Sequence, residues 1–199
     1  MLLNYNITGF FYSKNEFHFR EYLNIRRKLS NQSKPDLMVI MMNPGSSKPL
    51  VDNSYNKEVL TKPDNTQYQI IKVMEQFNYN YARILNLSDY REPKSKVFYT
   101  KISELENNGI SHSIFSTERK NDFEKLFVYK VPVIFAWGVH YKLRFLANKA
   151  IEKMDIKNPI GIKKKKKDYA YYHPLPRSHQ KQKEWIININ ELIKAHNNQ

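Results

Sequence analysis

Residues 36–45 read DLMVIMMNPG, an apolar run that ends at an Asn-Pro-Gly turn. A short apolar run bounded by turn residues is typical of a strand buried on both faces of a sheet. Such strands belong to parallel sheets that carry helices on either side. This stretch therefore predicts an α/β fold.

Three further runs continue the pattern along the chain. They are YARILNL at 81–87, VPVIFAW at 131–137 and the shorter YAYYH at 169–173. Strands that alternate with helical segments predict parallel pairing. We therefore expect a three-layer α/β/α sandwich around a mainly parallel sheet of about four strands.

The segments between these runs have helical spacing. Thr66 is a candidate N-cap for a helix that reaches Phe77. Helices are also expected over 141–154 and 181–195, and a short one ends near 123–129. The apolar residues expected to face the core along the three longer helices are Ile70, Val73, Met74, Phe77, Leu143, Leu146, Ala150, Met154, Trp185, Ile189, Leu192 and Ile193.

The N-terminal region precedes the first of these strands. Residues 1–13 predict a short strand or hairpin, and Glu16 to Leu29 predicts a basic helix. Residues 1–30 would then extend a core at 37–195. No linker or internal repeat divides the chain, so residues 1–199 are expected to form a single domain.

Composition excludes several classes of protein. The chain has 199 residues, no cysteine and five glycines. Disulfides, iron–sulfur clusters and cysteine-bound zinc are therefore excluded, and no glycine-rich nucleotide loop is present. We expect no metal and no cofactor. Because no apolar run approaches the roughly 20 residues of a membrane span and no secretion signal is present, we expect a cytoplasmic protein without a membrane partner.

The charge favours a polyanionic partner. The net charge is +14, and residues 141–199 hold 14 basic and 5 acidic residues. A basic excess of this kind favours nucleic acid, although lysine-rich coding bias or a solvated loop would also explain it. The densest part is the run Lys163, Lys164, Lys165, Lys166 and Lys167.

The residues that directly follow the predicted strands are the candidates for a site, because open parallel sheets bind ligands at the carboxyl ends of their strands. These segments are 43–47, 86–89, 138–140 and 173–178. They offer amides, hydroxyls and imidazole but no cluster of carboxylates. Such an edge suits an anion or the edge of a base better than acid–base chemistry.

Four motifs in these segments carry a resemblance. MMNPG, LNL, AWG and HPLPR occur in the order and approximate spacing found in an uncharacterised bacterial family, domain of unknown function 1643. The same order resembles the uracil-DNA glycosylase superfamily over residues 37–195. The resemblance implies a DNA glycosylase that flips a base out of the stack and cuts its N-glycosyl bond.

The resemblance implies two catalytic residues. Asn43 would orient the attacking water, since an amide cannot accept a proton as a base. His173 would donate a hydrogen bond to the base oxygen on which negative charge develops. Either residue could instead be structural, Asn43 by capping its turn and His173 by satisfying the loop around it.

A base pocket and a DNA-binding surface follow from the same resemblance. Gly45 stands where uracil-specific enzymes carry a tyrosine wall, so the pocket should admit pyrimidines enlarged at C5; glycine also suits a turn that needs positive φ. The implied pocket residues are Pro44, Gly45, Asn86, Asp89, Tyr55 and Tyr68. The implied DNA contacts are Ser46, Ser47, Arg177, Ser178 and the lysine run 163–167.

The expected function is excision of a modified or mismatched pyrimidine from DNA by a monomeric enzyme that leaves an abasic site. Hypermodified cytosine of phage DNA is one candidate target, which would make the protein an antiviral defence factor. A non-catalytic nucleic-acid-binding module with the same fold is the alternative. An enzyme that acts on free nucleotides is less consistent with the basic C-terminal third.

Overall fold

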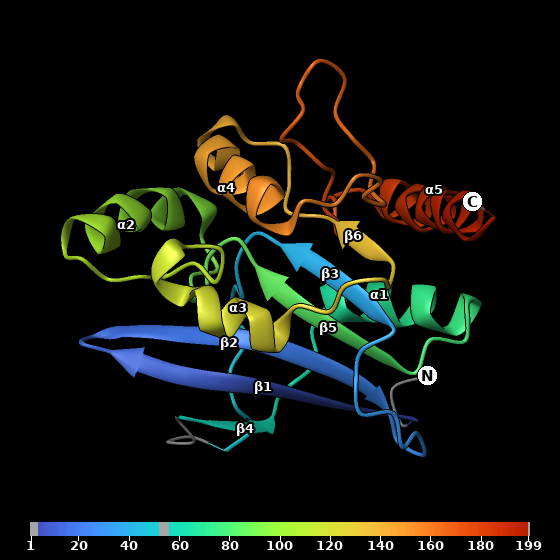
Figure 1. Cartoon of the computed structure of the whole chain (residues 1–199), viewed down its shortest axis with the longest axis horizontal. Helices are drawn as coiled ribbons and strands as arrows, with labels where there is room; N and C mark the ends of the chain where they lie inside the picture. The colour runs from blue at the N-terminus through green and yellow to red at the C-terminus, as the bar shows by residue number, and fades with distance from the viewer. Residues whose placement is uncertain (1–3, 52–55, 199) are drawn as a thin grey trace.

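The computed structural model describes residues 4–51 and 56–198, which form a six-stranded mixed sheet with helices on both faces (Figure 1). The strand order is β4-β1-β2-β5-β3-β6. The strands are β1 (Tyr5–Lys14), β2 (Phe17–Arg27), β3 (Leu37–Met41), β4 (Lys57–Leu60), β5 (Tyr81–Asn86) and β6 (Val133–Phe135).

The parallel part of the sheet lies at β5-β3-β6. Leu37–Met41 pairs with β5 on one side and β6 on the other, and all five of its residues are buried. The predicted strands at 36–42, 81–87 and 131–137 are thus confirmed. The predicted strand at 169–173 is wrong: Tyr171 forms only isolated bridges, to Gly138 and Lys163.

The sheet is also larger and less parallel than predicted, because the N-terminal region joins it. The predicted helix at 16–29 is wrong. Residues Phe17–Arg27 are a strand that pairs antiparallel with both β1 and β5. Phe17, Phe19, Leu23 and Ile25 recur with a period of two and are buried, which is strand patterning. The basic hairpin therefore lies within the sheet.

A β-bulge interrupts this pairing. Phe10 pairs with Tyr22 and Phe11 pairs with Arg20, so Glu21 has no partner across β1. A bulge adds one residue and reverses the face to which later side chains point. Phe17 and Phe19 consequently belong to one core cluster, whereas Leu23 and Ile25 belong to the other.

Five α-helices are present in the described residues: α1 (Asn65–Gln76), α2 (Ser95–Asn107), α3 (Lys120–Leu126), α4 (Arg144–Met154) and α5 (His179–Asn197). The cap of α1 is Asp64 rather than the predicted Thr66. Its carboxylate accepts the N–H of Gln67, whose side chain returns a bond to the cap. The helices α2 and α5 differ from the sequence interpretation as well, since α2 was not predicted and α5 begins two residues early.

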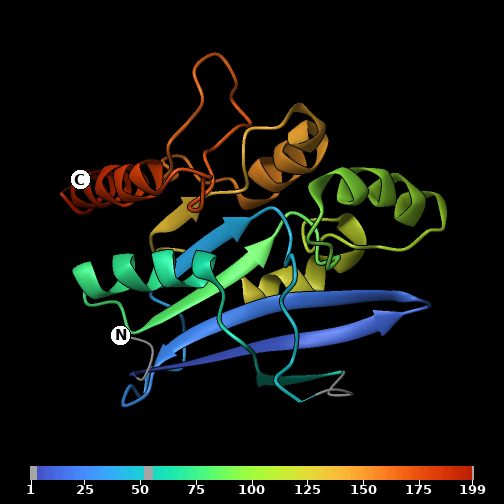
Figure 2. The same cartoon turned by 180° about the vertical axis from the view of Figure 1, so that it is seen from behind.

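Helices α1 and α5 cover one face of the sheet, and α2, α3 and α4 pack against the other (Figures 1 and 2). The first face buries Ile70, Val73, Met74, Trp185, Ile189 and Ile193, and the second buries Leu143, Leu146, Ala150 and Met154. These core assignments agree with the sequence. Phe77 is partly buried beside the first cluster, whereas Leu192 is 39% exposed and does not face the core as predicted.

Gly161 has a specific packing role beside β6. A Cβ on this residue would lie 2.7 Å from the carbonyl oxygen of Phe135 and 2.6 Å from the ring of Tyr171. Backbone on one side and a buried ring on the other leave no space for a methyl group. Gly161 therefore sets how closely the segment that leads to His173 approaches the sheet.

We predict that Gly161→Ala destabilises the protein by about 1–3 kcal/mol, the usual cost of overpacking a core. Thermal unfolding followed by circular dichroism measures the effect. Ala195→Gly, on the exposed last turns of α5, is a control for exchanging the same two residue types. An unchanged melting temperature for Gly161→Ala would contradict the close packing.

Candidate functional site

A cleft of about 380 Å³ opens where β3 ends and α1 begins. Its position at the carboxyl edge of the parallel strands is where such sheets bind ligands. The end of β3 and its turn supply one wall, the first turn of α1 a second, and the segment around His173 a third. The lining residues are Arg20, Met41, Met42, Asn43, Pro44, Gly45, Ser46, Asp64, Asn65, Thr66, Gln67, Ile84, Pro93, His173 and Leu175.

Asn43 is held by its amide nitrogen. Nδ2 donates to the carbonyl oxygens of Tyr90, at 3.3 Å, and of Glu92, at 2.7 Å. Both carbonyls belong to the loop after β5, so Asn43 joins the ends of two parallel strands. With both N–H groups engaged, only the amide oxygen is left to interact with a ligand, and it can do so only as an acceptor.

The turn after Asn43 divides into exposed and buried parts. Gly45 has φ +60°, and a Cβ placed there would meet no atom within 4 Å. The positive φ agrees with the argument from the turn, whereas the missing wall of a base pocket stays a prediction. Ser46 is exposed at the rim, whereas Pro44 and Ser47 are buried.

His173 lies in the cleft as a neutral imidazole with a defined tautomer. Nδ1 accepts the backbone N–H of Leu175 at 3.1 Å, so the ring proton resides on Nε2. Burial lowers the pKa of the ring to about 4, although the carboxylate of Asp64 opposes the shift. The imidazole can therefore donate a hydrogen bond at neutral pH without carrying charge.

Asn86 is the last residue of β5 and is fully buried. Its side-chain oxygen and nitrogen both lack a hydrogen-bond partner. Asn86 pairs with Met41 and alternates with Ile84, two residues that line the cleft, so its side chain belongs to the same face of the sheet. Asn86 is not among the residues that line the cleft, and a buried amide without partners is costly.

Two charged residues of the cleft were not identified from the sequence. Arg20 comes from β2, which had been interpreted as a helix outside the core, and Asp64 precedes α1 by one residue. The side chain of Arg20 is only 3% exposed. The sequence does indicate Asp64 as a helix cap, because an Asp three residues before a Gln is a capping pattern.

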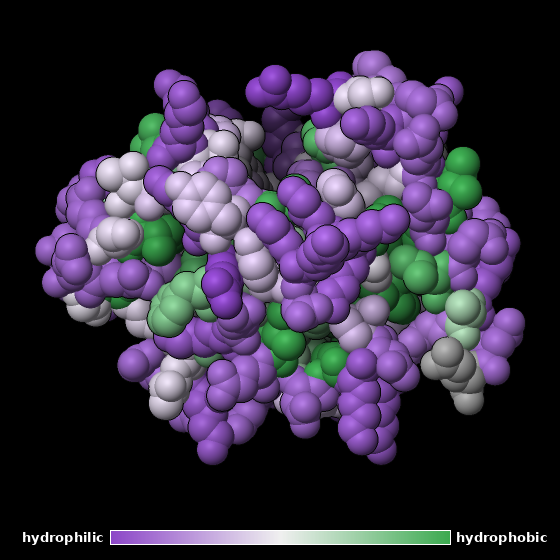
Figure 3. Space-filling view, turned by 90° about the horizontal axis from the view of Figure 1, so that it is seen from above, coloured by the Kyte–Doolittle hydropathy of each residue, from purple (hydrophilic) through white to green (hydrophobic). Residues whose placement is uncertain are grey.

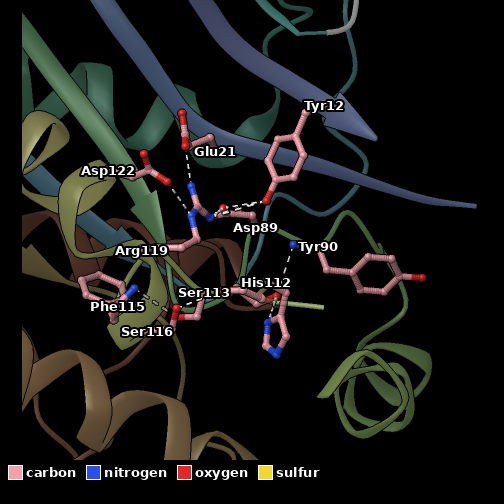
Figure 4. A network of polar contacts seen from close by, with 12 residues as sticks. Tyr12, Glu21, Asp89, Tyr90, His112, Ser113, Phe115, Ser116, Arg119 and Asp122 are labelled. Carbon is pink, nitrogen blue, oxygen red and sulfur yellow. Dashed lines mark hydrogen bonds and ion pairs between the residues drawn. The ribbon is translucent and has the colours of Figure 1, made fainter. Parts of the chain in front are cut away.

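Asp89 does not line the cleft. Its fully buried carboxylate forms an ion pair with Arg119 and accepts the hydroxyl of Tyr12 at 3.1 Å (Figure 4). Arg119 also pairs with Glu21 and Asp122, so one guanidinium holds three carboxylates. Burial raises the pKa of Asp89 to about 7, while Arg119 counteracts the shift.

The loop that contains Asp89, residues 88–92, also positions the cleft. The backbone N–H of Arg20 donates to the carbonyl of Asp89 at 2.9 Å, and Nε of Arg91 donates to the carbonyl of Ser47 at 2.5 Å. Together with the two bonds from Asn43, these contacts fix the loop at 88–92 to β2 and to the turn after β3. The Arg119 network therefore supports the cleft from the opposite face of the sheet.

The remaining predicted residues that the structure describes do not line the cleft. Tyr68 is partly buried on α1, Arg177 is exposed, and Ser178 caps α5 by accepting the N–H of Lys181. Tyr55 lies outside the described residues. The five lysines form an outer loop closed by a bond from the N–H of Lys164 to the carbonyl of Ala170 and by an ion pair between Lys163 and Asp168.

The surface around this loop is hydrophilic. Figure 1 shows the loop after α4 standing away from the sheet, and Figure 3, seen from above, shows hydrophilic side chains over most of that face. Across residues 4–51 and 56–198, no helix is long and apolar enough to cross a bilayer. The same residues contain no group of three or more His, Asp or Glu side chains that could hold a metal ion.

The fold is an α/β fold with a polar cleft at the carboxyl edge of its parallel strands. Residues 20–175 match one family over most of the chain. The chain belongs to the family described as protein of unknown function (DUF1643). Comparisons with curated proteins and with solved structures found no match.

We predict that Arg119→Ala lowers the free energy of unfolding by roughly 3–5 kcal/mol, because it leaves the buried carboxylate of Asp89 without its ion-pair partner. Urea denaturation measures the change. Lys194→Ala removes an exposed ion pair with Glu191 and should have no measurable effect. Equal stability of the two variants would show that the network does not hold the loop.

A second prediction concerns acid. His112 is buried in the loop after α2, where Nδ1 shares a hydrogen bond with the hydroxyl of Ser88. Burial lowers the pKa of His112 and of His173 from 6.5 to about 4. Unfolded imidazoles take up protons below pH 6.5 while the folded ones do not, so stability should fall as the pH drops from 6.5 to 4. His173→Gln should reduce this slope. A wild-type slope in His173→Gln would contradict the burial argument.

Proposed function

We propose that this protein is a DNA glycosylase that excises a mismatched or C5-substituted pyrimidine and leaves an abasic site. The observation that carries the proposal is the convergence of Asn43 and His173 on one cleft, with complementary hydrogen-bonding capacity. Asn43 offers an acceptor, and His173 offers a neutral donor. The proposal includes the fold, which we propose to be that of the uracil-DNA glycosylase superfamily.

The chemistry needs a stabilised leaving group. Cleavage of an N-glycosyl bond passes through a sugar with oxocarbenium character and leaves negative charge on the base. Nε2–H of a neutral His173 can donate to a base oxygen as that charge develops. Because its pKa is about 4, the donor state is maintained throughout the neutral range.

The chemistry also needs a water, and two side chains of the cleft suit it. The amide oxygen of Asn43 can accept a hydrogen bond from the water and orient it. Asp64 is the only acidic side chain among the described residues that line the cleft, so it is our candidate for the proton acceptor. The roles of orienting and deprotonating the water would then fall to separate residues.

Base recognition is assigned to Asn86 and the open turn. The unpartnered amide of Asn86 has both the donor and the acceptor that reading a pyrimidine edge requires. The empty space at Gly45 leaves room for a substituent at C5. Excision of a hypermodified cytosine, and with it a role in defence against phage, is the most specific form of the proposal.

The first test is an abasic-site assay. Labelled DNA carrying uracil, a G·T mismatch, 5-hydroxymethylcytosine or glucosylated cytosine is incubated with the protein and then cleaved with hot alkali. Breaks at one base type, and none in unmodified DNA, are expected. Salt-sensitive DNA binding without breaks on any substrate would instead favour the non-catalytic module.

For the substrate that is cut, we predict that His173→Ala slows excision about 10²–10³-fold while DNA binding persists. Single-turnover kinetics and a binding titration measure the two effects. Arg144→Gln, on the exposed side of α4, serves as a control. Wild-type excision by His173→Ala would refute the assigned role.

Asp64 permits a sharper test, because Asn caps a helix as well as Asp does. Asp64→Asn should therefore keep the melting temperature while reducing excision about 10²-fold or more, as expected for loss of a general base. Asp64→Ala would in addition cost about 1 kcal/mol of stability through the lost cap. Full activity in Asp64→Asn would assign Asp64 to capping alone.

A further inference from the structure

Among the described residues, Arg20 is a buried cation without an ion-pair partner. Its side chain is 3% exposed and Nε has no hydrogen-bond partner. The nearest negative charge in the cleft, Asp64, attracts it without forming an ion pair. Buried arginines are normally paired, since an unpaired charge loses its hydration without compensation.

The fold holds this side chain in place. A Cβ at Gly9 would lie 3.2 Å from Cδ of Arg20 and 3.2 Å from Oγ1 of Thr61, so the glycine makes room for the arginine stem. The bulge at Glu21 separates the two neighbours: Arg20 lines the cleft and Glu21 binds Arg119. The guanidinium is thus built into the cleft from a strand outside the parallel core.

The surrounding charges favour an anion. The first turn of α1, residues 65–67, lines the same cleft, and the N-terminal end of a 12-residue helix is electropositive. Two carboxylates among the described residues attract Arg20: Asp89, which is itself bound to Arg119, and Asp64, which is the one that lines the cleft.

We propose that Arg20 and the N-terminus of α1 form an oxyanion subsite that binds a phosphate group in this cleft. A planar guanidinium can donate two parallel hydrogen bonds to such a group. The phosphate could come from a free nucleotide or from a DNA strand. The subsite does not depend on catalysis and remains whether the cleft cuts a base or only binds one.

Isothermal titration at fixed ionic strength tests the subsite with inorganic phosphate, thymidine, thymidine 5′-monophosphate and a short thymidine oligonucleotide. The monophosphate should bind about tenfold tighter than thymidine, or better, and Arg20→Gln should abolish that difference. Arg144→Gln removes one exposed charge and should preserve it. Equal binding of the monophosphate and thymidine by the wild type would overturn the proposal.

The two sources of phosphate give different results. If the oligonucleotide depends on Arg20 and the monophosphate is bound as well, the subsite accepts a phosphate in either setting. If the monophosphate alone depends on Arg20, the ligand is a free nucleotide. Neither result requires excision, so an inactive protein would contradict the proposed glycosylase without touching this inference.

Stability separates a ligand-binding role from a structural one. Without ligand, Arg20→Gln should melt no lower than the wild type, because it removes a buried charge that has no partner. Phosphate should raise the melting temperature of the wild type but not of the variant. A large fall for Arg20→Gln, with the same response to phosphate, would make Arg20 a structural residue and refute the subsite.

Discussion

The ion pair between Arg119 and the buried Asp89 is the contact on which the cleft depends. It lies on the face of the sheet covered by α3, yet it fixes the loop whose carbonyls hold Asn43 and the backbone of Arg20. A loop carrying so many engaged backbone groups has little freedom to move. The cleft is therefore preorganised by residues on the opposite face of the sheet, which a ligand in the cleft would not contact.

The cleft itself combines rigid and unsatisfied groups. The amide nitrogen of Asn43 and Nδ1 of His173 are both engaged by the backbone, which orients the atoms that remain available. Arg20, which lines the cleft, and Asn86, on the same face of the sheet, are by contrast buried with polar atoms that have no partner. Proteins tolerate such groups where function requires them, because the cost is recovered when a ligand binds.

Sequence patterns predicted the parallel half of this fold and the turn that forms its edge. The strands at 37–41, 81–86 and 133–135 are apolar runs between turn residues, and burial on both faces explains why they are recognisable. Asn43 and Gly45 line the cleft because they follow the end of β3. His173 lines it because it follows Tyr171, whose isolated bridges hold this segment beside the sheet. These positions follow from topology, which local sequence encodes well.

The antiparallel half was not predicted, since its signal is weaker and more ambiguous. The segment 17–27 is rich in charged residues, and its alternation competes with an equally plausible helical spacing. Because this segment was predicted to be a helix outside the core, Arg20 was not among the predicted site residues. Asp89 follows a strand as Asn43 does, but its partner Arg119 lies 30 residues further along the chain, and nothing local indicates that pairing. Long-range charge pairing is a property of the folded chain alone.

The bulge in β2 also constrains how the chain could vary in length. Extra residues at the hairpin turn near Asn15 would lengthen a loop and leave the strand pairing intact. Loss of a single residue between Arg20 and Leu23 would remove the bulge and return the strand to uninterrupted alternation. Either Arg20 or the apolar residues after it would then turn to the opposite face of the sheet. The spacing of this hairpin, as much as the identity of its residues, therefore decides whether the cleft contains a cation.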